Sequence, residues 1–195
     1  MSIRKSGLLL VVLGTILLLA ASFAQGAEFS ATMVTKAGGM EIPGKFYVKG
    51  EKVRNEIQVA GQTAIHIMRA DKKVMWILMP QQKAYMEMPL TQEALQKMAP
   101  PTEEQKAKMK KVGSETIDGY ACDKYETTMS HQDKPMKVFT WIATDLGMPI
   151  KMVSEDGSFS MDYKDIKPGE VADSLFEVPD GYQKMKMPMA MPPSQ

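Results

Sequence analysis

The chain has 195 residues, enough for one domain with a sizeable hydrophobic core, and its formal net charge is only +1. This balance excludes the strongly basic surface that attracts nucleic acids, so we do not expect nucleic acid as a partner. The single cysteine, Cys122, excludes an internal disulfide, and stability must therefore come from the core. The unusual feature of the composition is its 19 methionines.

The first residues have the pattern of a secretory signal peptide. Met1 to Lys5 is short and basic, Leu8 to Ala21 is apolar, and small residues follow at Ser22 to Ala24 and at Ala27. The apolar run is shorter than the ~18 residues of a membrane-spanning helix, and no cysteine follows it for attachment of a lipid. We therefore expect residues 1–24 to be removed, with cleavage as late as 27 as the alternative. The mature protein would then be a soluble periplasmic protein.

Strand patterns dominate the mature chain, which opens with a predicted strand at Glu28 to Lys36. From Gly44 to Pro89, runs rich in β-branched and aromatic residues are separated by short turn signals. Such short links join only antiparallel neighbours, because a parallel crossover needs a dozen or more residues. One of these runs, Val74 to Met79, is apolar at every position, so both of its faces must avoid water. We expect a second cover over this strand, either helices or a bound apolar molecule.

Helical signals follow Pro89. Thr91 is the predicted N-cap of a helix that reaches Met98, and Thr102 to Gln105 matches a capping box that opens a second short helix to about Lys110. Two helices inserted between strands are a natural cover for the apolar face of the sheet. A mobile lid is the functional version of the same arrangement.

Strands resume after the helices, at residues 111–117, 120–129, 136–143, 149–154 and 158–166. Asp118-Gly119 and Asp156-Gly157 between them are typical hairpin turns, and residues 172–176 form one predicted helical turn. The end of the chain, residues 183–195, is rich in methionine and proline without a packing period, and we expect it to be disordered. The sequence therefore predicts one mainly β domain over residues 28–182, with about ten antiparallel strands.

Three segments carry motifs in a fixed order. The first motif, Gly-x-x-aromatic-Val-Lys, spans Gly44 to Lys49. The second is a predicted strand with a central tryptophan that ends in proline, from Ala70 to Pro80. The third, Phe-x-x-Pro-x-Gly, lies within Leu175 to Tyr182 and matches a closing strand. These motifs resemble the superfamily of periplasmic outer-membrane lipoprotein carriers and receptors. The resemblance implies an open, curved antiparallel half-barrel with short helices covering its concave face, and a cavity for lipid or acyl chains. The chain begins with a strand where carriers have a helix, and it has Gly50 where they have a basic residue, so a branch other than the lipoprotein carrier itself is expected.

The sequence contains no convincing catalytic set. The two histidines, His66 and His131, lie in separate elements, and His66 is interpreted as a hydrogen-bonded histidine of an apolar strand rather than as a general base. Cys122, with Lys124 as the only basic neighbour on its strand face, is interpreted as a buried, inert thiol. Because a glycine-rich phosphate loop and zinc-type spacings are also absent from the sequence, we expect neither an enzyme nor a cofactor.

The methionines favour a ligand of apolar character, because their flexible and polarisable side chains suit surfaces that accept varied apolar partners. The expected partner is a hydrophobic or amphipathic molecule, such as a lipid or an acyl chain, with membrane proteins of the envelope as further partners. The residues expected to contact it are Trp76, Leu78, Met86, Met88, Leu95 and Met98. The inward face of the 74–79 strand stays open at this point, and Met75 and Ile77 are the alternative to Trp76 and Leu78.

A second interpretation concerns the end of the chain. Met185, Met187, Met189 and Met191 recur at every second residue, and thioethers are soft ligands for Cu(I). In an extended strand, however, the side chains of residues i and i+2 lie about 6.6 Å apart, too far to share one small ion unless the chain bends. A methionine-based periplasmic Cu(I)-binding protein is thus the alternative to a lipid-binding protein. A sensor that acts through a protein partner is a third interpretation, which no residue of the sequence favours.

Overall fold

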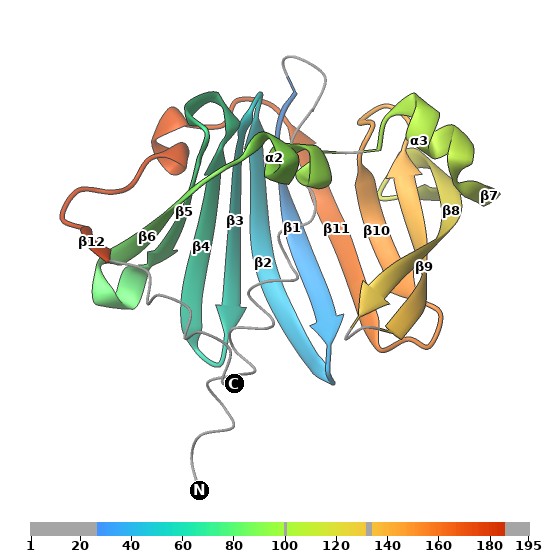
Figure 1. Ribbon diagram of the computed structural model, residues 1–195, viewed down its shortest axis with the longest axis horizontal. Helices are drawn as coiled ribbons and strands as arrows, with labels where there is room; N and C mark the ends of the chain where they lie inside the picture. The colour runs from blue at the N-terminus through green and yellow to red at the C-terminus, as the bar shows by residue number, and fades with distance from the viewer. Residues whose placement is uncertain (1–26, 100, 132–133, 186–195) are drawn as a thin grey trace, which may run out of the picture.

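The computed structural model describes residues 27–99, 101–131 and 134–185, and a single sheet dominates it (Figure 1). The predicted signal peptide lies outside these residues. In chain order the elements are β1 (Glu28–Ala37), β2 (Met40–Lys49), β3 (Lys52–Val59), β4 (Gln62–Arg69), η1 (Ala70–Lys72), β5 (Val74–Met79), η2 (Pro80–Gln82), β6 (Ala84–Pro89), α2 (Gln92–Met98), α3 (Glu103–Lys108), β7 (Lys110–Ile117), β8 (Tyr120–His131), β9 (Lys134–Ala143), β10 (Pro149–Ser154), β11 (Phe159–Pro168), η3 (Asp173–Phe176) and β12 (Gln183–Met185). In the described part of the chain, no helix is both long enough and apolar enough to cross a membrane.

The twelve described strands form one open, curved sheet in the order β12-β6-β5-β4-β3-β2-β1-β11-β10-β9-β8-β7. Neighbouring strands are antiparallel except for β12 and β6, which are parallel. β1 joins the two halves of the sheet, because it pairs with β2 on one side and with β11 on the other. The predicted fold class, mainly β with only short helices, is confirmed, with twelve described strands where about ten were expected.

The strand β12 extends the folded domain beyond the predicted boundary at residue 182. Gln183 to Met185 pair with Ala84 to Met86 of β6, and the Gln183 N–H donates to the Lys83 carbonyl at 2.8 Å. The segment before it, residues 177–182, is not a strand, although the motif of the resembling superfamily implied one there. Residues 186–195, the rest of the predicted tail, lie outside the described part of the chain.

Tight turns occur where the sequence predicts them. Asp118 and Gly119 link β7 to β8 with φ of 50° and 82°, and positive φ at both central residues is typical of a type I′ hairpin turn. The 3₁₀ turns η1 and η2 link β4 to β5 and β5 to β6, and each is followed by a lysine in the left-handed region, Lys73 at 53° and Lys83 at 46°. These links make the first six strands a continuous meander.

Both α-helices begin at the predicted caps. Thr91 Oγ1 accepts a hydrogen bond from the Ala94 N–H at 3.2 Å, which starts α2. At α3 the capping box is complete, because Thr102 Oγ1 accepts from the Gln105 N–H at 3.2 Å and Gln105 Oε1 accepts from the Thr102 N–H at 2.8 Å. α3 ends at Lys108, two residues before the predicted end.

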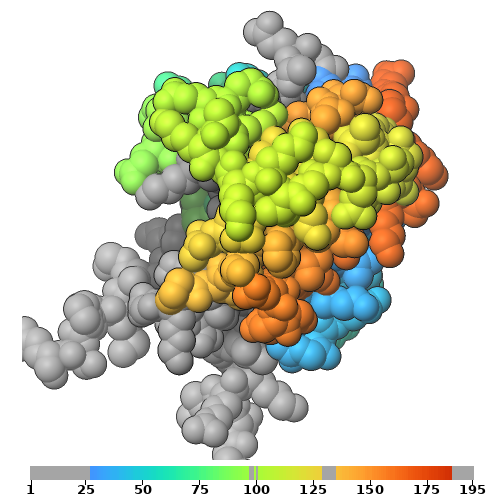
Figure 2. Space-filling model, turned by 90° about the vertical axis from the view of Figure 1, so that its right-hand side faces the viewer, coloured from blue at the N-terminus to red at the C-terminus, as the bar shows by residue number. Residues whose placement is uncertain are grey.

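The two helices do not cover the same surface. α2 lies across the sheet near one end of β2 and β3, whereas α3 lies at the end of the sheet formed by β7 and β8 (Figure 1). In the side view of Figure 2, the yellow-green residues of the α2–α3 region form a surface layer over the yellow and orange strands β8 to β11. None of the residues of α3 is buried, so α3 contributes no buried side chain to the core.

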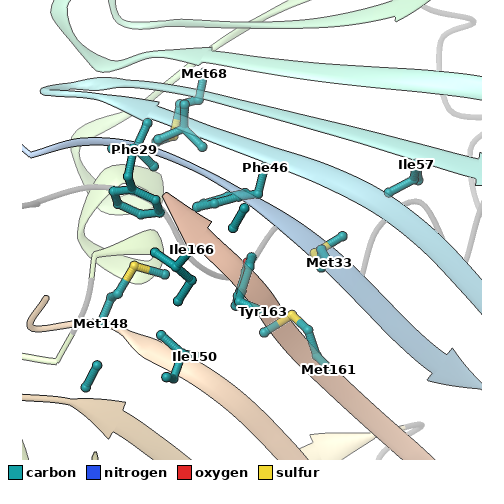
Figure 3. Close-up of a cluster of buried hydrophobic side chains, with 14 of the residues drawn as sticks. Phe29, Met33, Phe46, Ile57, Met68, Met148, Ile150, Met161, Tyr163 and Ile166 are labelled. Atoms are coloured by element: carbon teal, nitrogen blue, oxygen red, sulfur yellow. The ribbon is translucent and has the colours of Figure 1, made fainter. Parts of the chain in front are cut away.

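Most of the core lies on the face of the sheet that carries α2, which we call the inner face. Side chains from strands far apart in sequence meet there, among them Phe29 of β1, Phe46 of β2 and Tyr163 of β11 (Figure 3). The rings of Phe46 and Tyr163 are 4.8 Å apart between centroids, a separation typical of favourable aromatic pairs. Leu95 of α2 packs against this cluster and stays only partly buried.

A smaller core cluster lies on the opposite, outer face and is covered by residues 171–182. Leu78 of β5 and Phe176 of η3 are both fully buried there, at 0% exposure. Val171 completes the cover from the start of the segment. Over β4 and β5, the outer face of the sheet is therefore covered by a segment that lies far away in the sequence.

Candidate ligand-binding site

Alternation along β5 separates the residues predicted to bind a ligand. Trp76 and Leu78 belong to the outer cluster and pack with Phe176. Met75 lies on the inner face, where it joins the main cluster, and Ile77 shares that face because side chains two residues apart in a strand point to the same side. Of the two alternatives that the sequence left open, the structure therefore selects Met75 and Ile77 as the inner residues of this strand.

Trp76 is fixed on the outer face by polar contacts. Its Nε1–H donates to Glu87 Oε2 at 3.0 Å, and Lys184 Nζ donates to the other carboxylate oxygen of Glu87 at 2.6 Å. The hydrogen bonds from Lys184 and then from Trp76 hold the pKa of the Glu87 carboxyl below its usual range. Trp76 thereby connects β5 to β6 and, through Lys184, to β12.

Arginine side chains hold the covering segment, residues 171–182, on the outer face. Arg54 Nη1 donates to the Leu175 carbonyl at 2.8 Å, and Arg69 Nη1 donates to the Phe176 carbonyl at 3.2 Å. Both guanidinium groups come from the sheet, and both residues are buried, at 8% and 5% exposure. The backbone of the segment thus gains donors that a purely apolar contact would not supply.

Lysines and further acidic residues add to this attachment. Lys52 Nζ and Lys49 Nζ donate to the Asp173 carboxylate at 2.7 Å and 3.1 Å and hold the pKa of Asp173 below its usual range. Arg69 also forms ion pairs with Asp71 and Glu177, and these hydrogen bonds raise the pKa of the guanidinium further. The second cover that the apolar strand β5 requires is therefore this segment of the chain itself, which corrects the expectation of helices or a bound molecule on that side.

Methionines line the inner face of the last strands of the meander. Met68, Met75 and Met88 lie side by side on β4, β5 and β6, since Met68 pairs with Met75 and Met75 with Met88. Met68 and Met75 are buried, whereas Met88 is only half-buried, and both Met88 and Leu95 of α2 pack against the main core cluster. This row belongs to the inner face, where the main core cluster lies and against which α2 also packs.

The next row along the same strands contains Ile77 opposite Met86, and both side chains are half-buried. Met185 of β12 lies beside Met86 and is 43% exposed. The predicted ligand residues Met86, Met88 and Leu95 therefore share the inner face. Met98 belongs to α2, but its side chain lies outside the described part of the structure.

Two buried polar residues continue this second row. Asn55 of β3 and His66 of β4 are paired across the strands and are 5% and 3% exposed. Among the described residues, Asn55 Oδ1 and His66 Nδ1 have no hydrogen-bond partner. Burial lowers the pKa of His66 to about 4, so its imidazole is neutral at neutral pH. His66 lies in an apolar strand as predicted, but its Nδ1 lacks the predicted hydrogen bond.

Sequence reasoning missed Asn55, although a signal for it exists. Val53 and Ile57 mark the buried face of β3 by their period of two, and Asn55 stands between them on that face. A polar residue at an apolar position of an alternating strand indicates a buried polar side chain. The signal gives the position of Asn55 but not the state of its hydrogen bonds.

The groups with catalytic or metal-binding potential lie apart. Cys122 is buried at 2% exposure, as predicted, and burial raises the pKa of its thiol. Six strands of the sheet lie between β8, which carries Cys122, and β4, which carries His66. In the described ranges, no three His, Cys, Asp or Glu side chains are grouped so that they could hold a metal ion. Of the methionines in the predicted Cu(I) tail, only Met185 is described, and Met187, Met189 and Met191 lie outside the described residues.

Solved structures share this fold at low sequence identity. An uncharacterised conserved protein from Thermus thermophilus matches with a TM-score of 0.57 and 13% identity, over 82% of this chain and 90% of that protein. A chain of the MucA/MucB complex of Pseudomonas aeruginosa matches with a TM-score of 0.52 and 16% identity, over 87% of this chain and 62% of that chain. A structure of MucB matches with a TM-score of 0.50 and 16% identity, over 80% and 58% of the two chains. This chain therefore spans only about three fifths of those two chains.

At these low identities, the similarities show the fold alone. No curated protein sequence matches the chain. The model of the family described as "Domain of unknown function (DUF4412)" matches residues 29–148, which is more than half of the chain. The chain therefore belongs to the DUF4412 family.

Proposed function

We propose that this protein is a periplasmic binding or carrier protein for a hydrophobic or amphipathic ligand, a lipid or an acyl chain, which it holds between the inner face of the sheet and α2. The observation that carries the proposal is the incomplete cover of that face. Ile77, Met86, Met88 and Leu95 remain half-buried on adjoining elements. Contiguous apolar side chains that the fold does not fully cover mark a surface for an apolar partner.

The composition of this surface favours an acyl chain. Methionine adapts its shape to varied apolar partners, and each methylene group that the ligand buries contributes ~0.8 kcal/mol. On the opposite face of β4 and β5, residues 171–182 already cover the apolar cluster of Ile67, Trp76 and Leu78. The ligand would therefore enter beneath α2, which acts as a lid.

Export and partners complete the proposal. The signal-peptide pattern of residues 1–24 supports a periplasmic location. MucB has been solved in complex with MucA, which supports a protein as a second kind of partner. We propose a membrane protein of the envelope in this role, and we do not propose nucleic acid. We propose no enzymatic activity, because His66 and Cys122 are buried on separate parts of the sheet.

Native mass spectrometry tests the ligand directly. The mature protein is purified from periplasm without detergent, and its mass is compared with that of the denatured chain. We expect an adduct of lipid mass, and its identity would name the ligand class. If the protein carries no adduct and also takes up no oleyl alcohol on incubation, the proposal is wrong.

A pair of variants tests the site. Leu95→Asp places a charge on the half-buried face of α2 and should lower lipid retention at least tenfold, because a buried carboxylate without a partner is strongly unfavourable. The matched control is Val112→Asp, which adds the same charge at an apolar residue of β7 that is 39% exposed. Equal retention in both variants would show that α2 is not part of the site.

One observation favours the alternative, a methionine-based Cu(I) protein. β12 brings Met185, the first methionine of the series that continues at Met187, next to Met86 on the edge of the sheet. Thioethers from both segments are suitable ligands for Cu(I). Removal of residues 186–195 leaves β12 in place and should abolish stoichiometric Cu(I) uptake if this alternative holds. Lipid retention should then be unchanged, which separates the two functions.

A further inference from the structure

The pair of Asn55 and His66 lies in the middle of the proposed ligand face. It occupies the row that continues from Met86 and Ile77, directly beside the row of Met68, Met75 and Met88. Opposite residues of an antiparallel pair have Cβ atoms about 5 Å apart, so one small polar group could contact both side chains. The surroundings are apolar, since Phe46 lies opposite Asn55 and Ile77 lies opposite His66.

The hydrogen bonds of this pair are incomplete. Asn55 Oδ1 and His66 Nδ1 are buried without a partner among the described residues, although buried polar atoms in folded proteins are nearly always hydrogen-bonded. The two residues are at most 5% exposed, so bulk water does not satisfy these atoms. An unpartnered buried pair of this kind indicates that a group from outside the chain supplies the missing bonds.

The chemistry of the pair selects that group. An amide oxygen accepts hydrogen bonds, and a neutral imidazole has one accepting and one donating nitrogen. A hydroxyl group donates its one proton to Asn55 Oδ1 and accepts a hydrogen bond from His66 Nδ1–H, so it satisfies the pair when His66 carries its proton on Nδ1. A carboxylate only accepts, and its charge would be buried beside apolar side chains without a cation.

We propose that Asn55 and His66 form the polar end of the lipid site and that the ligand is a neutral lipid that places a free hydroxyl group between them. This inference rests on the proposed function and adds the class of ligand, a long-chain alcohol or a partial ester of glycerol. The apolar part of such a molecule extends from the pair along the inner face, over Ile77 and Met86.

Two probes that differ only in the hydroxyl group test the inference. Oleyl alcohol and methyl oleyl ether have the same hydrocarbon chain, and each is titrated into the protein loaded with N-phenylnaphthylamine, a neutral fluorescent probe. Wild-type protein should bind the alcohol about tenfold more tightly than the ether, the value expected for one buried hydrogen bond. Asn55→Leu and His66→Leu should each reduce this ratio, and the double variant should bring it to about one.

Thr35→Val is the matched control. Thr35 of β1 is a third buried residue whose side-chain oxygen has no partner among the described residues, but it pairs with Ile42 in another row of the inner face. The variant should keep the full preference for the alcohol. Because each protein supplies its own ratio of affinities, a partly unfolded variant does not distort the comparison.

The outcomes separate the inference from the function on which it rests. If wild-type protein binds both probes equally, or if the double variant keeps the preference, the role of Asn55 and His66 is wrong and the apolar site remains. If neither probe displaces the fluorescent ligand, the proposed function fails and the inference fails with it.

Discussion

Acid should destabilise this protein through His66. The buried imidazole has a pKa of about 4, below the ordinary value of 6.5. Between these two pH values the unfolded chain binds a proton that the folded protein does not bind, so the free energy of unfolding falls as the pH decreases through this window. Above pH 6.5 the histidine is neutral in both states, and its contribution to the pH dependence vanishes.

The size of the effect follows from the two pKa values. Relative to pH 7.5, the free energy of unfolding should be lower by about 2 kcal/mol at pH 5 and by about 3 kcal/mol below pH 4. Carboxylates such as Asp71 and Glu177 have lowered pKa values in the folded protein. They lower the free energy of unfolding only at pH values where the same carboxylates bind protons in the unfolded chain, which is mainly below pH 5. Measurement at pH 5 therefore reports chiefly on His66.

Urea unfolding at pH 7.5 and pH 5, followed by tryptophan fluorescence, measures the loss in wild-type protein and in His66→Leu. Between pH 7.5 and pH 5, the free energy of unfolding of the variant should fall by only a few tenths of a kcal/mol, because the histidine that titrates is absent. The other titratable groups are the same in both proteins, so their contributions cancel in the comparison. Parallel losses in the two proteins would refute the argument, since His66 would then bind its proton equally well in the folded and unfolded states.

Three further substitutions test the packing of the sheet. Phe176→Ala should lower the free energy of unfolding by about 3–5 kcal/mol in urea, because it empties a fully buried aromatic site. Arg69→Ala should speed proteolytic cleavage within residues 171–182 before the sheet unfolds, because it removes a donor to the Phe176 carbonyl and leaves Glu177 with Lys72 as its remaining ion-pair partner. Gly44→Ala should destabilise by about 2 kcal/mol or more in thermal unfolding, since a Cβ there would lie 2.5 Å from a backbone carbonyl of β3, whereas Gly113→Ala, with open space around it, should be nearly neutral.

The meander could be predicted from sequence because its signals are local. Asp118-Gly119 and the short links around Lys73 and Lys83 each specify a turn within a few residues, and alternation between turns gives the strands. The caps of both helices were predictable for the same reason, since Thr91 and Thr102 bond within their own first turns. Local interactions of this kind need no knowledge of the rest of the fold.

The cover of β5 was not predictable by the same means. Leu78 and Phe176 are in the same buried cluster although about a hundred residues separate them in the sequence. An apolar run predicts that both faces of a strand are covered, but it does not predict which segment of the chain covers each face. Alternation along β5 was clear, but it assigns Trp76 and Met75 to opposite faces without telling which face is inner. Only the three-dimensional position of residues 171–182 resolves that choice.

The polar pair of the inner face was predictable in part. Period-two alternation puts Asn55 and His66 on the buried faces of their strands, and the short link between β3 and β4 makes them neighbours. Whether a buried polar atom finds a partner depends on every group that approaches it, and these groups come from distant strands. The missing hydrogen bonds that define the candidate site are therefore a property of the assembled sheet.

The two covers of the sheet differ in a way that ligand exchange requires. Residues 171–182 are attached to the outer face by buried arginines and by lysines that bond its backbone and its acids. On the inner face, α2 has only seven residues, and Leu95 reaches the core while half-buried. A helix of this length is not stable alone in water, so its position depends on packing against the sheet, in which Ala94 and Leu95 take part. Because β5 stays covered on its outer face when α2 moves, the inner face can open to a ligand while the sheet remains folded.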